Sequence, residues 1–211
     1  MISFCFTHKN RLDLNTGTEI LPLFKNCLST LKNCLESLEI DEYEICVSSF
    51  DEEEDYKKLD NFLKNLFSHD KVKIKKIAKH ENFSRGTGRN EAFNQSSGDI
   101  IFFLDVDMLF MRSEMISNAL IAIKENKVYF PICYSMYEDG SGDWRSTGYG
   151  NCVVPRSAML EIKWIHKETW GKEDDIFYEE MKRRYKIVRK KCAGYYHQWH
   201  PSLAPGKGWS K

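Results

Sequence analysis

The chain has 211 residues, 42% of them hydrophobic, so it is long enough to bury the core of a single domain. Its 31 basic and 31 acidic residues balance, which excludes an overall field attracting nucleic acid or an anionic membrane. The seven cysteines are odd in number and include no C-x-x-C pair. This pattern argues against a disulfide framework or a zinc site and favours reduced thiols in a cytosol-like compartment.

The N-terminus begins with a strand-length apolar segment, Ile2–Phe6, directly after Met1. It lacks the basic segment and long apolar stretch of a signal peptide. No apolar run in the chain approaches the roughly 20 residues that cross a bilayer. We therefore expect a cytoplasmic protein without a transmembrane segment.

Apolar strand segments alternate with helical segments through the first 130 or so residues. This alternation predicts an α/β fold with a mainly parallel central sheet flanked by helices. No linker or repeat divides the chain, so we expect one Rossmann-like domain over residues 1–211. The expected strands are Ile2–Phe6, Tyr43–Ser48, Val72–Ile77, Ile100–Leu104 and Lys127–Pro131, and the expected helices are Ile20–Leu38, Tyr56–Phe67, Gly88–Phe93 and Met115–Ile123.

The pattern changes after about residue 133, where Glu138–Asp143 reads as a polar, turn-rich loop. The C-terminal tail, with its prolines and glycines from Pro201 onward, is expected to be irregular and to act as a lid. The later elements expected are a strand at Asn151–Val154, a helix at Arg156–Ile162, a helix from about Asp174 to Arg184 and a strand at Tyr185–Arg189.

Polar residues directly follow three of the expected strands, at Thr7–Arg11, Ser48–Asp51 and Asp105–Asp107. Ligands of α/β sheets gather at the carboxyl ends of the strands. Asp105 and Asp107 stand at i and i+2, so they point the same way off an extended backbone. Their carboxylates suit Mg²⁺ or Mn²⁺ carrying a diphosphate. Any strand can end in two acids, but the five apolar residues that precede this pair favour the metal interpretation.

Cations follow the first strand and open the helix after residue 83. Lys9 and Arg11 are of the type that pairs with phosphate oxygens, although exposed loop charges are the simpler alternative. The segment Phe83–Asn90 contains Arg85 and Arg89, and free backbone N–H groups at a helix start favour anions. We interpret these residues as donor-binding.

His197 and His200 lie close together in an aromatic segment near the C-terminus. A histidine is more often structural than a ligand. An imidazole added to a set of aspartates, however, favours Mn²⁺ over Mg²⁺. The sequence leaves open which of the two binds the metal.

The segment Trp170–Asp175 places a flat apolar ring beside three acids. The acidic triplet could simply be the first turn of a helix. An aromatic face with adjacent carboxylates also suits a sugar, and a carboxylate within reach of an attacking hydroxyl can serve as a general base. Asp174 is the candidate base, with Glu173 or Asp175 as the alternatives.

These motifs, in this order, resemble those of metal-dependent inverting glycosyltransferases of the GT-A fold. The nearest likenesses are the β-1,4-galactosyltransferases and the bacterial chondroitin polymerase transferase domains. The resemblance extends over nearly the whole chain, and the tryptophan-glycine-acidic segment Trp170–Asp175 is its most specific part.

The resemblance implies a nucleotide-sugar donor, with uridine diphosphate as the leaving group, a glycan or glycoconjugate acceptor, and Mn²⁺ or Mg²⁺. It implies a donor-binding half at residues 1–107 and an acceptor and catalytic half at residues 108–211. Asp107 would bind the metal, and Asp105 would contact it or the donor. Asp174 would be the base, and His197 would complete the metal shell unless His200 does so. The other implied roles are nucleotide contacts for Thr7, Lys9, Arg11 and Asp51, and sugar or acceptor contacts for Tyr149, Trp170, Glu173 and Asp175.

One departure is Lys172, which replaces the second glycine of the galactosyltransferase pattern and puts the sugar specificity of those enzymes in doubt. The chain also lacks the membrane stem of Golgi relatives, which fits a bacterial or viral enzyme. A nucleotidyltransferase acting on sugar phosphates is the second interpretation, but Thr7–Arg11 contains no glycine for a phosphate loop. A non-catalytic carbohydrate-binding module on the same fold is the third.

Overall fold

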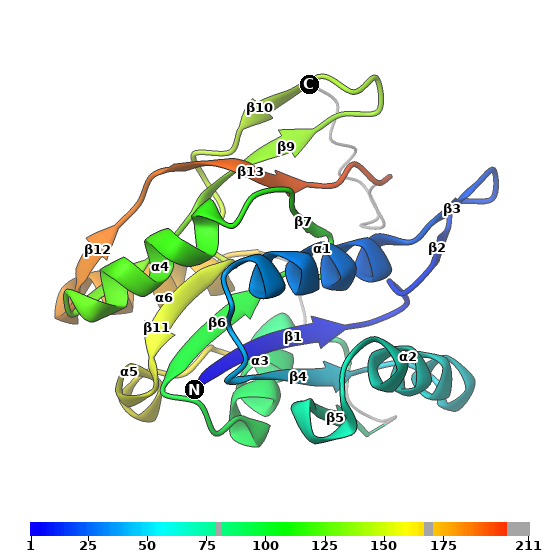
Figure 1. The fold of residues 1–211 in the computed structure, drawn as a ribbon, viewed down its shortest axis with the longest axis horizontal. Helices are drawn as coiled ribbons and strands as arrows, with labels where there is room; N and C mark the ends of the chain where they lie inside the picture. The colour runs from blue at the N-terminus through cyan, green and yellow to red at the C-terminus, as the bar shows by residue number, and fades with distance from the viewer. Residues whose placement is uncertain (79–81, 167–170, 202–211) are drawn as a thin grey trace.

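A seven-stranded sheet forms the centre of the molecule (Figure 1). The computed structural model describes residues 1–78, 82–166 and 171–201. The strand order is β12-β8-β11-β6-β1-β4-β5, and all neighbours are parallel except β11, which is antiparallel to β6 and β8. The predicted α/β fold with a mainly parallel sheet is confirmed. The strands are β1 (Ile2–His8), β2 (Leu14–Asn15), β3 (Ile20–Leu21), β4 (Tyr43–Ser49), β5 (Val72–Lys76), β6 (Ile100–Leu104), β7 (Met108–Phe110), β8 (Lys127–Tyr129), β9 (Ile132–Met136), β10 (Gly142–Trp144), β11 (Cys152–Pro155), β12 (Lys186–Val188) and β13 (Lys191–His197).

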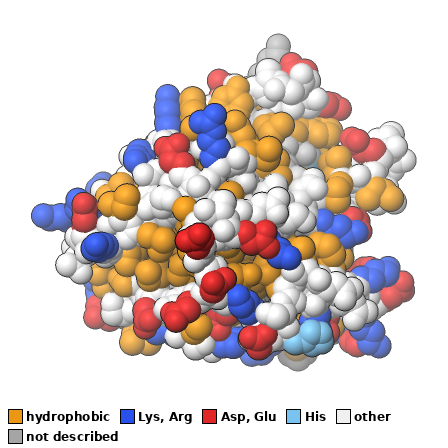
Figure 2. Space-filling model, viewed as in Figure 1, with side chains coloured by type: hydrophobic (Ala, Val, Ile, Leu, Met, Phe, Trp, Pro, Cys, Tyr) orange, Lys and Arg blue, Asp and Glu red, His pale blue; other side chains and the backbone are white. Residues whose placement is uncertain are grey.

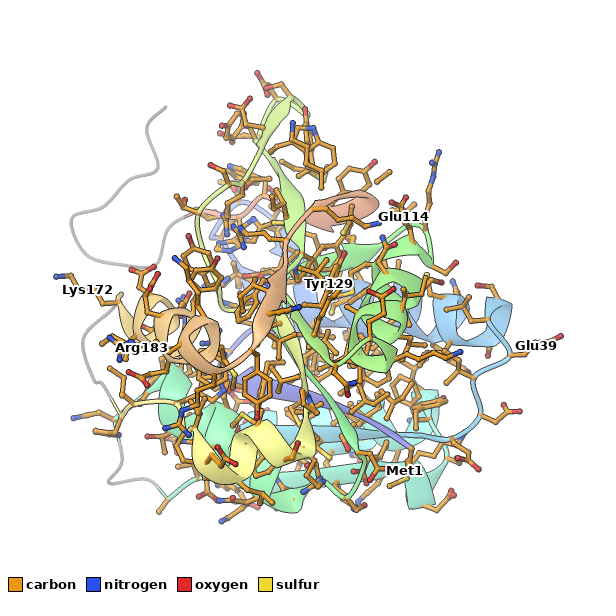
Figure 3. The ribbon with its side chains drawn as sticks, turned by 90° about the vertical axis from the view of Figure 1, so that its left-hand side faces the viewer. Met1, Glu39, Glu114, Tyr129, Lys172 and Arg183 are labelled. Atoms are coloured by element: carbon orange, nitrogen blue, oxygen red, sulfur yellow. The ribbon has the colours of Figure 1, made fainter. Side chains whose placement is uncertain are left out.

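Helices cover both faces of this sheet and bury two hydrophobic clusters against it. Residues of α1, α2 and α4 pack on one face, and residues of α3, α5 and α6 pack on the other. Tyr129 of β8 is fully buried and lies in the middle of the molecule (Figure 3). The helices are α1 (Leu23–Ser37), α2 (Glu53–Leu66), α3 (Arg85–Gln95), α4 (Glu114–Lys124), α5 (Arg156–Glu161) and α6 (Glu173–Arg184), with a 3₁₀ turn η1 at His69–Lys71.

Three helices begin at residues other than those predicted. The helix predicted from Ile20 starts at Leu23, because Ile20–Leu21 pairs with Leu14–Asn15 in a hairpin. Pro22 then directly precedes the first turn. A backbone N–H at this position would have no partner within the helix, so its absence in proline loses no hydrogen bond. The helix α2 starts earlier than predicted because its first turn accepts acidic side chains near the positive end of the helix dipole. In α3, the side chain of Ser84 accepts a hydrogen bond from the backbone N–H of Thr87. This cap lets the helix begin at Arg85, before the predicted start at Gly88.

A second sheet, with the order β10-β9-β13-β7, was not predicted (Figure 1). Of the segment Glu138–Asp143, predicted as a loop, the first residues form the turn of a hairpin between β9 and β10, whereas Gly142 and Asp143 belong to β10 itself. The strand β13 occupies residues for which the sequence predicted no strand. It pairs with β7 and β9, which are distant in sequence, so local periodicity gave no sign of it. Residues 202–211 of the tail lie outside the described residues.

The surface is mixed in charge. On the face seen in Figure 2, acidic and basic side chains are interspersed among hydrophobic and neutral ones.

All seven cysteines are free and buried. Among the helices of the described residues, none is long and apolar enough to cross a membrane.

Candidate active site

The carboxyl ends of β1, β4 and β6 meet at one edge of the central sheet. These strands are parallel neighbours, with Thr7 opposite Ser48 and Phe6 opposite Leu104. The polar segments that follow the three strands therefore lie side by side, as the sequence predicted. The small second sheet joins the same edge, because β7 begins directly after Asp107 and pairs with β13.

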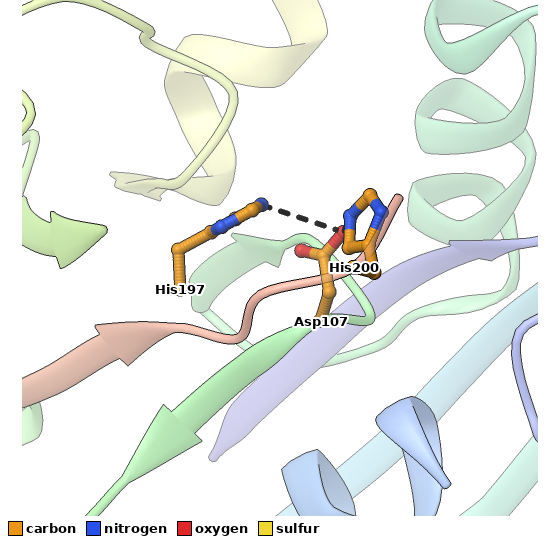
Figure 4. A group of neighbouring side chains, drawn as sticks. All are labelled: Asp107, His197 and His200. Atoms are coloured by element: carbon orange, nitrogen blue, oxygen red, sulfur yellow. Dashed lines mark hydrogen bonds and ion pairs between the residues drawn. The ribbon is translucent and has the colours of Figure 1, made fainter. Parts of the chain in front are cut away.

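Asp107, His197 and His200 form a group whose ligand atoms all lie within 4.8 Å of one another. Nε2 of His200 is 3.2 Å from Oδ2 of Asp107, and Nε2 of His197 is 3.7 Å from the same oxygen. Figure 4 shows the Asp107 carboxylate between the two imidazoles. The antiparallel pairing of β13 with β7 places His197 opposite Met108 and so brings these distant parts of the sequence together. The sequence analysis left open which of the two histidines binds the metal, whereas the fold places both beside Asp107.

The arrangement of these three side chains fits a divalent cation. Nδ1 of His200 is 3.0 Å from the carbonyl oxygen of Pro201, which can only accept, so Nδ1 carries the proton. In the neutral imidazole, Nε2 then presents its lone pair toward Asp107, and a cation between these two acceptors would stabilise them at that distance. Oδ1 of Asp107 and Nδ1 of His197 are buried and have no hydrogen-bond partner among the described residues. Ligands about 2.1 Å from such a cation and at right angles would lie ~3 Å apart, close to the observed spacing.

The electrostatics of this group favour the forms that bind metals. Burial would raise the pKa of Asp107, but in acid, where His197 is protonated, the charge of His197, the contact with His200 and the charge of Arg11 hold it well below its usual range. Burial lowers the pKa of His197 to about 4, so its imidazole is neutral at physiological pH. Nη1 of Arg11 lies 4.0 Å from Oδ2 of Asp107 and, within the described ranges, makes no hydrogen bond.

Gln198, which the sequence analysis did not assign a role, fastens the end of β13 to this edge. Its backbone N–H donates to the carbonyl oxygen of Asp107 at 2.8 Å. Its side-chain Nε2 donates to the carbonyl oxygen of Leu23 at 2.9 Å, and its Oε1 accepts from Asn26 at 3.0 Å. Gln198 is thereby hydrogen-bonded both to Asp107, directly before β7, and to the start of α1.

Asp105 has different neighbours from Asp107, so the two acids of the predicted motif do not share one set of contacts. Its Oδ1 accepts from Nη2 of Arg89 at 3.0 Å, and its Oδ2 accepts from Nδ2 of Asn151 at 3.1 Å. The backbone N–H of Asp105 donates to Oδ1 of Asn151 at 2.8 Å, which closes a two-bond pairing. Asp105 thus points toward α3 and β11, away from the two histidines.

Arg89, predicted to contact the donor, lies buried between Asp105 and Asp174. Nη1 of Arg89 is 3.3 Å from Oδ1 of Asp174, the candidate base at the start of α6. Burial would lower the pKa of Arg89, but the charges of Asp174 and Asp105 raise it, so the guanidinium stays protonated. Gly150 of the adjoining loop lies so close to this guanidinium that a Cβ there would overlap Nη2 of Arg89.

The other predicted acceptor residues are dispersed. Glu173 is buried, its pKa is raised by burial and by the charge of Asp174, and Nη1 of Arg85 lies 3.6 Å from its Oε1. Tyr149 stacks on Tyr178 of α6 with ring centroids 4.0 Å apart. Asp175 is exposed on the outer side of α6, in a shallow surface hollow shared with Lys172. Trp170 lies outside the described residues.

A small cavity lies beside the predicted nucleotide residues, with a volume of about 190 Å³. Lys9 and Asp51 line it, but the Asp51 carboxylate is occupied within the protein by the His8 ring, the Asn10 N–H and the Ser49 hydroxyl. The ammonium of Lys9 lies 5.8 Å from the centre of the Phe83 ring, which packs edge-on against Phe50. The complete lining is Lys9, Asn10, Phe50, Asp51, Glu52, Ile77 and Ala78.

Thr7, near the end of β1, lies against α3. Its Oγ1 is buried and makes no hydrogen bond to the described residues. Gly88 of α3 lies against the Thr7 side chain so closely that a Cβ there would overlap it. Gly88 therefore permits close packing of α3 on β1. This packing accounts for the glycine, and no phosphate-binding loop is needed to explain it.

Four residues that shape the site were missed in the sequence: His8, Gly150, Asn151 and Gln198. A polar side chain at a strand end, as in His8, or directly before a strand, as in Asn151, is the only local signal. The only local signal for Gln198 is its place between two histidines. Gly150 had no signal of its own, because its role depends on the side chains that other elements place around it.

Comparison with known proteins places this site in a family context. The sequence profile described as Glycosyl transferase family 2 matches residues 20–191. The chain is 28% identical over 150 residues to chondroitin sulfate N-acetylgalactosaminyltransferase 2 of Homo sapiens. The match covers 59% of this chain and 28% of that enzyme, so the chain spans less than a third of the length of this relative.

Solved structures share the fold at low sequence identity. TarS of S. aureus in complex with UDP has a TM-score of 0.66 at 17% identity, over 95% of this chain and 61% of that one. The mannosyltransferase PcManGT of Pyrobaculum calidifontis, in complex with GDP-Man and Mn²⁺, has 0.62 at 11% identity, over 93% and 56%. The 4-diphosphocytidyl-2C-methyl-D-erythritol synthase of Anaerococcus prevotii has 0.59 at 16% identity, over 90% and 86%. These likenesses establish the GT-A fold and, since a synthase shares it, the fold alone does not select the reaction.

Proposed function

Because the chain belongs to glycosyl transferase family 2, we propose that it is a metal-dependent, inverting enzyme. It transfers a sugar from a UDP-sugar to a hydroxyl of a glycan or glycoconjugate. The observation that carries this proposal is the group formed by Asp107, His197 and His200 beside Arg11, with Oδ1 of Asp107 buried and unpaired among the described residues.

The donor diphosphate would lie between this group and the loop after β1. Mn²⁺, held by Asp107 and the two histidines, would neutralise the charge that develops on the departing diphosphate. Arg11 supplies a guanidinium at this point, and burial lowers its pKa while Asp107 opposes that effect. Arginine and lysine at positions 11 and 9 suit phosphate oxygens. The uridine would occupy the cavity lined by Lys9 and Asp51.

Asp174 would accept the proton of the acceptor hydroxyl. As the proton moves to the carboxylate, the acceptor oxygen forms a bond to the anomeric carbon and the bond from that carbon to the diphosphate oxygen breaks. Attack from the face opposite the leaving group inverts the anomeric configuration, so a single base suffices. Glu173 and Tyr149, which flank Asp174 and Gly150 in the chain, would contact the sugar or the acceptor.

Other features support parts of this proposal. TarS, a fold relative, is known in complex with UDP, and PcManGT in complex with GDP-Man and Mn²⁺. We also propose that residues 1–107 supply most of the donor contacts and residues 108–211 most of the acceptor contacts, with His197 and His200 as the exceptions. A cytosol-like compartment is supported by the seven free, buried cysteines.

The test is a thermal-shift titration with UDP, UDP-sugars and other nucleotides, each with and without Mn²⁺, followed by product analysis by NMR. Metal-dependent stabilisation by a UDP-sugar and a product of inverted anomeric configuration are expected. Asp107→Ala should abolish metal-dependent binding, whereas Asp174→Asn should retain binding and lose transfer by orders of magnitude.

Three outcomes would contradict the proposal. Release of pyrophosphate from a nucleoside triphosphate and a sugar phosphate would show a nucleotidyltransferase. Sugar binding with no turnover of any nucleotide sugar would show a binding module. No response to any nucleotide would mean that the acids serve only the fold.

A further inference from the structure

Arg89 occupies a position that donor binding does not explain. It is 2% exposed and projects from α3 between two carboxylates that other elements supply. Nη2 lies 3.0 Å from Oδ1 of Asp105 at the end of β6, and Nη1 lies 3.3 Å from Oδ1 of Asp174 at the start of α6. The guanidinium therefore joins the first acid of the strand-end pair to the candidate base.

The orientation of this guanidinium is fixed by packing. Its central carbon lies 4.3 Å from the centre of the Trp164 ring. Trp164 in turn stacks on Phe177 of α6, with centroids 3.7 Å apart and an interplanar angle of 9°. Phe177 stands one turn after Asp174 on the same helix, so the aromatic stack beneath Arg89 includes a residue of the helix that carries Asp174. A buried, stacked arginine with both terminal nitrogens engaged has little freedom to swing toward a phosphate.

The contact leaves the two oxygens of Asp174 inequivalent. Oδ1 accepts from Arg89, whereas Oδ2 faces Gly150. A Cβ at Gly150 would lie 3.2 Å from Oδ2 of Asp174 and 3.2 Å from Oδ2 of Asp105, and would overlap Nη2 of Arg89. The absence of a side chain at Gly150 thus makes room for the Arg89 guanidinium between the two carboxylates. Oδ2 of Asp174, which is not the oxygen bonded to Arg89, is the one able to take a proton.

We propose that Arg89 is a positioning residue for the base: it holds Oδ1 of Asp174, leaves Oδ2 to receive the acceptor proton, and ties the base to Asp105. This inference rests on the proposed glycosyl transfer. It replaces the donor-binding role that the sequence suggested for Arg89. During transfer, the acceptor proton moves to Oδ2 of Asp174, and Arg89 remains paired with Asp105.

The charged and titratable groups around Asp174 define what Arg89 contributes. Asp105 and the neighbouring Glu173 are acids, and the Cys152 thiol is buried, with a pKa raised by that burial. Among the described residues, Arg89 is the cation in direct contact with Asp174.

The test compares Arg89→Lys with Arg156→Lys, a matched control. Arg156 is a second packed arginine, with Nε 2.6 Å from the carbonyl oxygen of Gly98 and its guanidinium carbon 4.9 Å from the Phe93 ring centre. It lies beside the amino ends of the strands, since it follows Pro155, which pairs with Ile100. Both variants are assayed in the full chain for UDP and Mn²⁺ binding, for donor KM and kcat, and for the pH dependence of kcat.

For Arg89→Lys we expect binding of UDP with Mn²⁺ and the donor KM to stay within about twofold of wild type, and kcat to fall about 100-fold. Because lysine keeps the positive charge beside Asp174, the pH dependence of kcat should stay close to that of wild type, so the loss of kcat reports the lost geometry. Arg156→Lys should change none of these. A merely structural arginine would lower the yield or the melting temperature and would leave the kcat of the folded protein unchanged.

If Arg89→Lys does not fold, Gly150→Ala supplies the second variant, because its Cβ would displace the same guanidinium without removing its charge. It too should lose kcat and retain metal-dependent UDP binding. Loss of UDP binding in either variant would return Arg89 to a donor role and overturn the proposal, as would unchanged kcat. Absence of transfer in the wild-type chain would instead refute the proposed function itself.

Discussion

The imidazole of His8 and the carboxylate of Asp51 form a buried pair, with Nδ1 2.5 Å from Oδ2, that joins the ends of β1 and β4. Nε2 of His8 accepts from the backbone N–H of Arg11 at 3.3 Å, so Nδ1 carries the proton and donates to Asp51. The second oxygen of Asp51 accepts from the N–H of Asn10 at 2.6 Å. The pair thereby shapes the loop that presents Arg11 to Asp107.

Asp51→Asn should therefore destabilise the protein by roughly 3 kcal/mol. The amide of asparagine has one acceptor oxygen, so the buried donors of His8 and Asn10 can no longer both be satisfied. Burial alone would raise the pKa of Asp51, but the bonds from His8 and Asn10 hold it below its usual value, so wild type binds these donors in the charged form. Urea unfolding at pH 7 measures the loss. Asp13→Asn is the control, since Asp13 pairs with Lys25 at the surface and should cost less than about 1 kcal/mol. Equal losses would show that the buried pair has no special role.

His197→Ala and His200→Ala should each weaken Mn²⁺ binding in the presence of UDP by at least about tenfold, because each removes one ligand from a group with three. The affinity can be read from the free Mn²⁺ signal in electron paramagnetic resonance titrations. His69→Ala, which alters an exposed histidine in η1, is the matched control and should bind as wild type does. If only one of the two variants loses affinity, the other histidine is not a ligand.

Lys172 has a left-handed backbone, with φ at 74°, directly after Gly171 at 96°. Figure 3 shows its side chain extending away from the body of the molecule. Lys172→Val should cost more than about 1 kcal/mol, because β-branched residues fit this conformation poorly. Lys172→Gly and Lys172→Asn should stay within about 0.5 kcal/mol of wild type in urea unfolding. A valine variant as stable as wild type would mean that this turn does not exist in solution.

Glu44 gives a pH-dependent contribution to stability at the opposite end of the sheet. Burial would raise its pKa, but hydrogen bonds from Lys73, Ser3 and Ser97 lower it to about 2. The folded pKa lies below the unfolded one, so the stabilisation is complete above about pH 4.5 and is lost as the pH falls toward 2. Its size should be roughly 2 kcal/mol.

The difference in unfolding free energy between wild type and Glu44→Gln, measured in urea from pH 7 down to pH 3, should shrink as the pH falls. Glu138→Gln, at an exposed position, is the comparison and should show no such trend. A difference that is independent of pH would mean that the Glu44 contacts are not ionic.

Much of the central sheet was predictable, because its signal is local. Five apolar strand segments and their helices follow from side-chain periodicity, and the polar strand ends follow from where those segments stop. Helix starts were wrong by a few residues where capping or proline decided them, as at Leu23 and Glu53. The second sheet was not predictable, since β7 and β13 are short and depend on partners far away in sequence.

The sequence by itself determined the alternating α/β order, the acids Asp105 and Asp107 at a strand end, and the presence of two histidines near the C-terminus. Only the tertiary structure decided that both histidines flank Asp107 and that Arg89 lies between Asp105 and Asp174. The physical reason is that strand register and helix packing set distances between residues far apart in the chain. A charged side chain's role follows from which opposite charge the fold buries beside it.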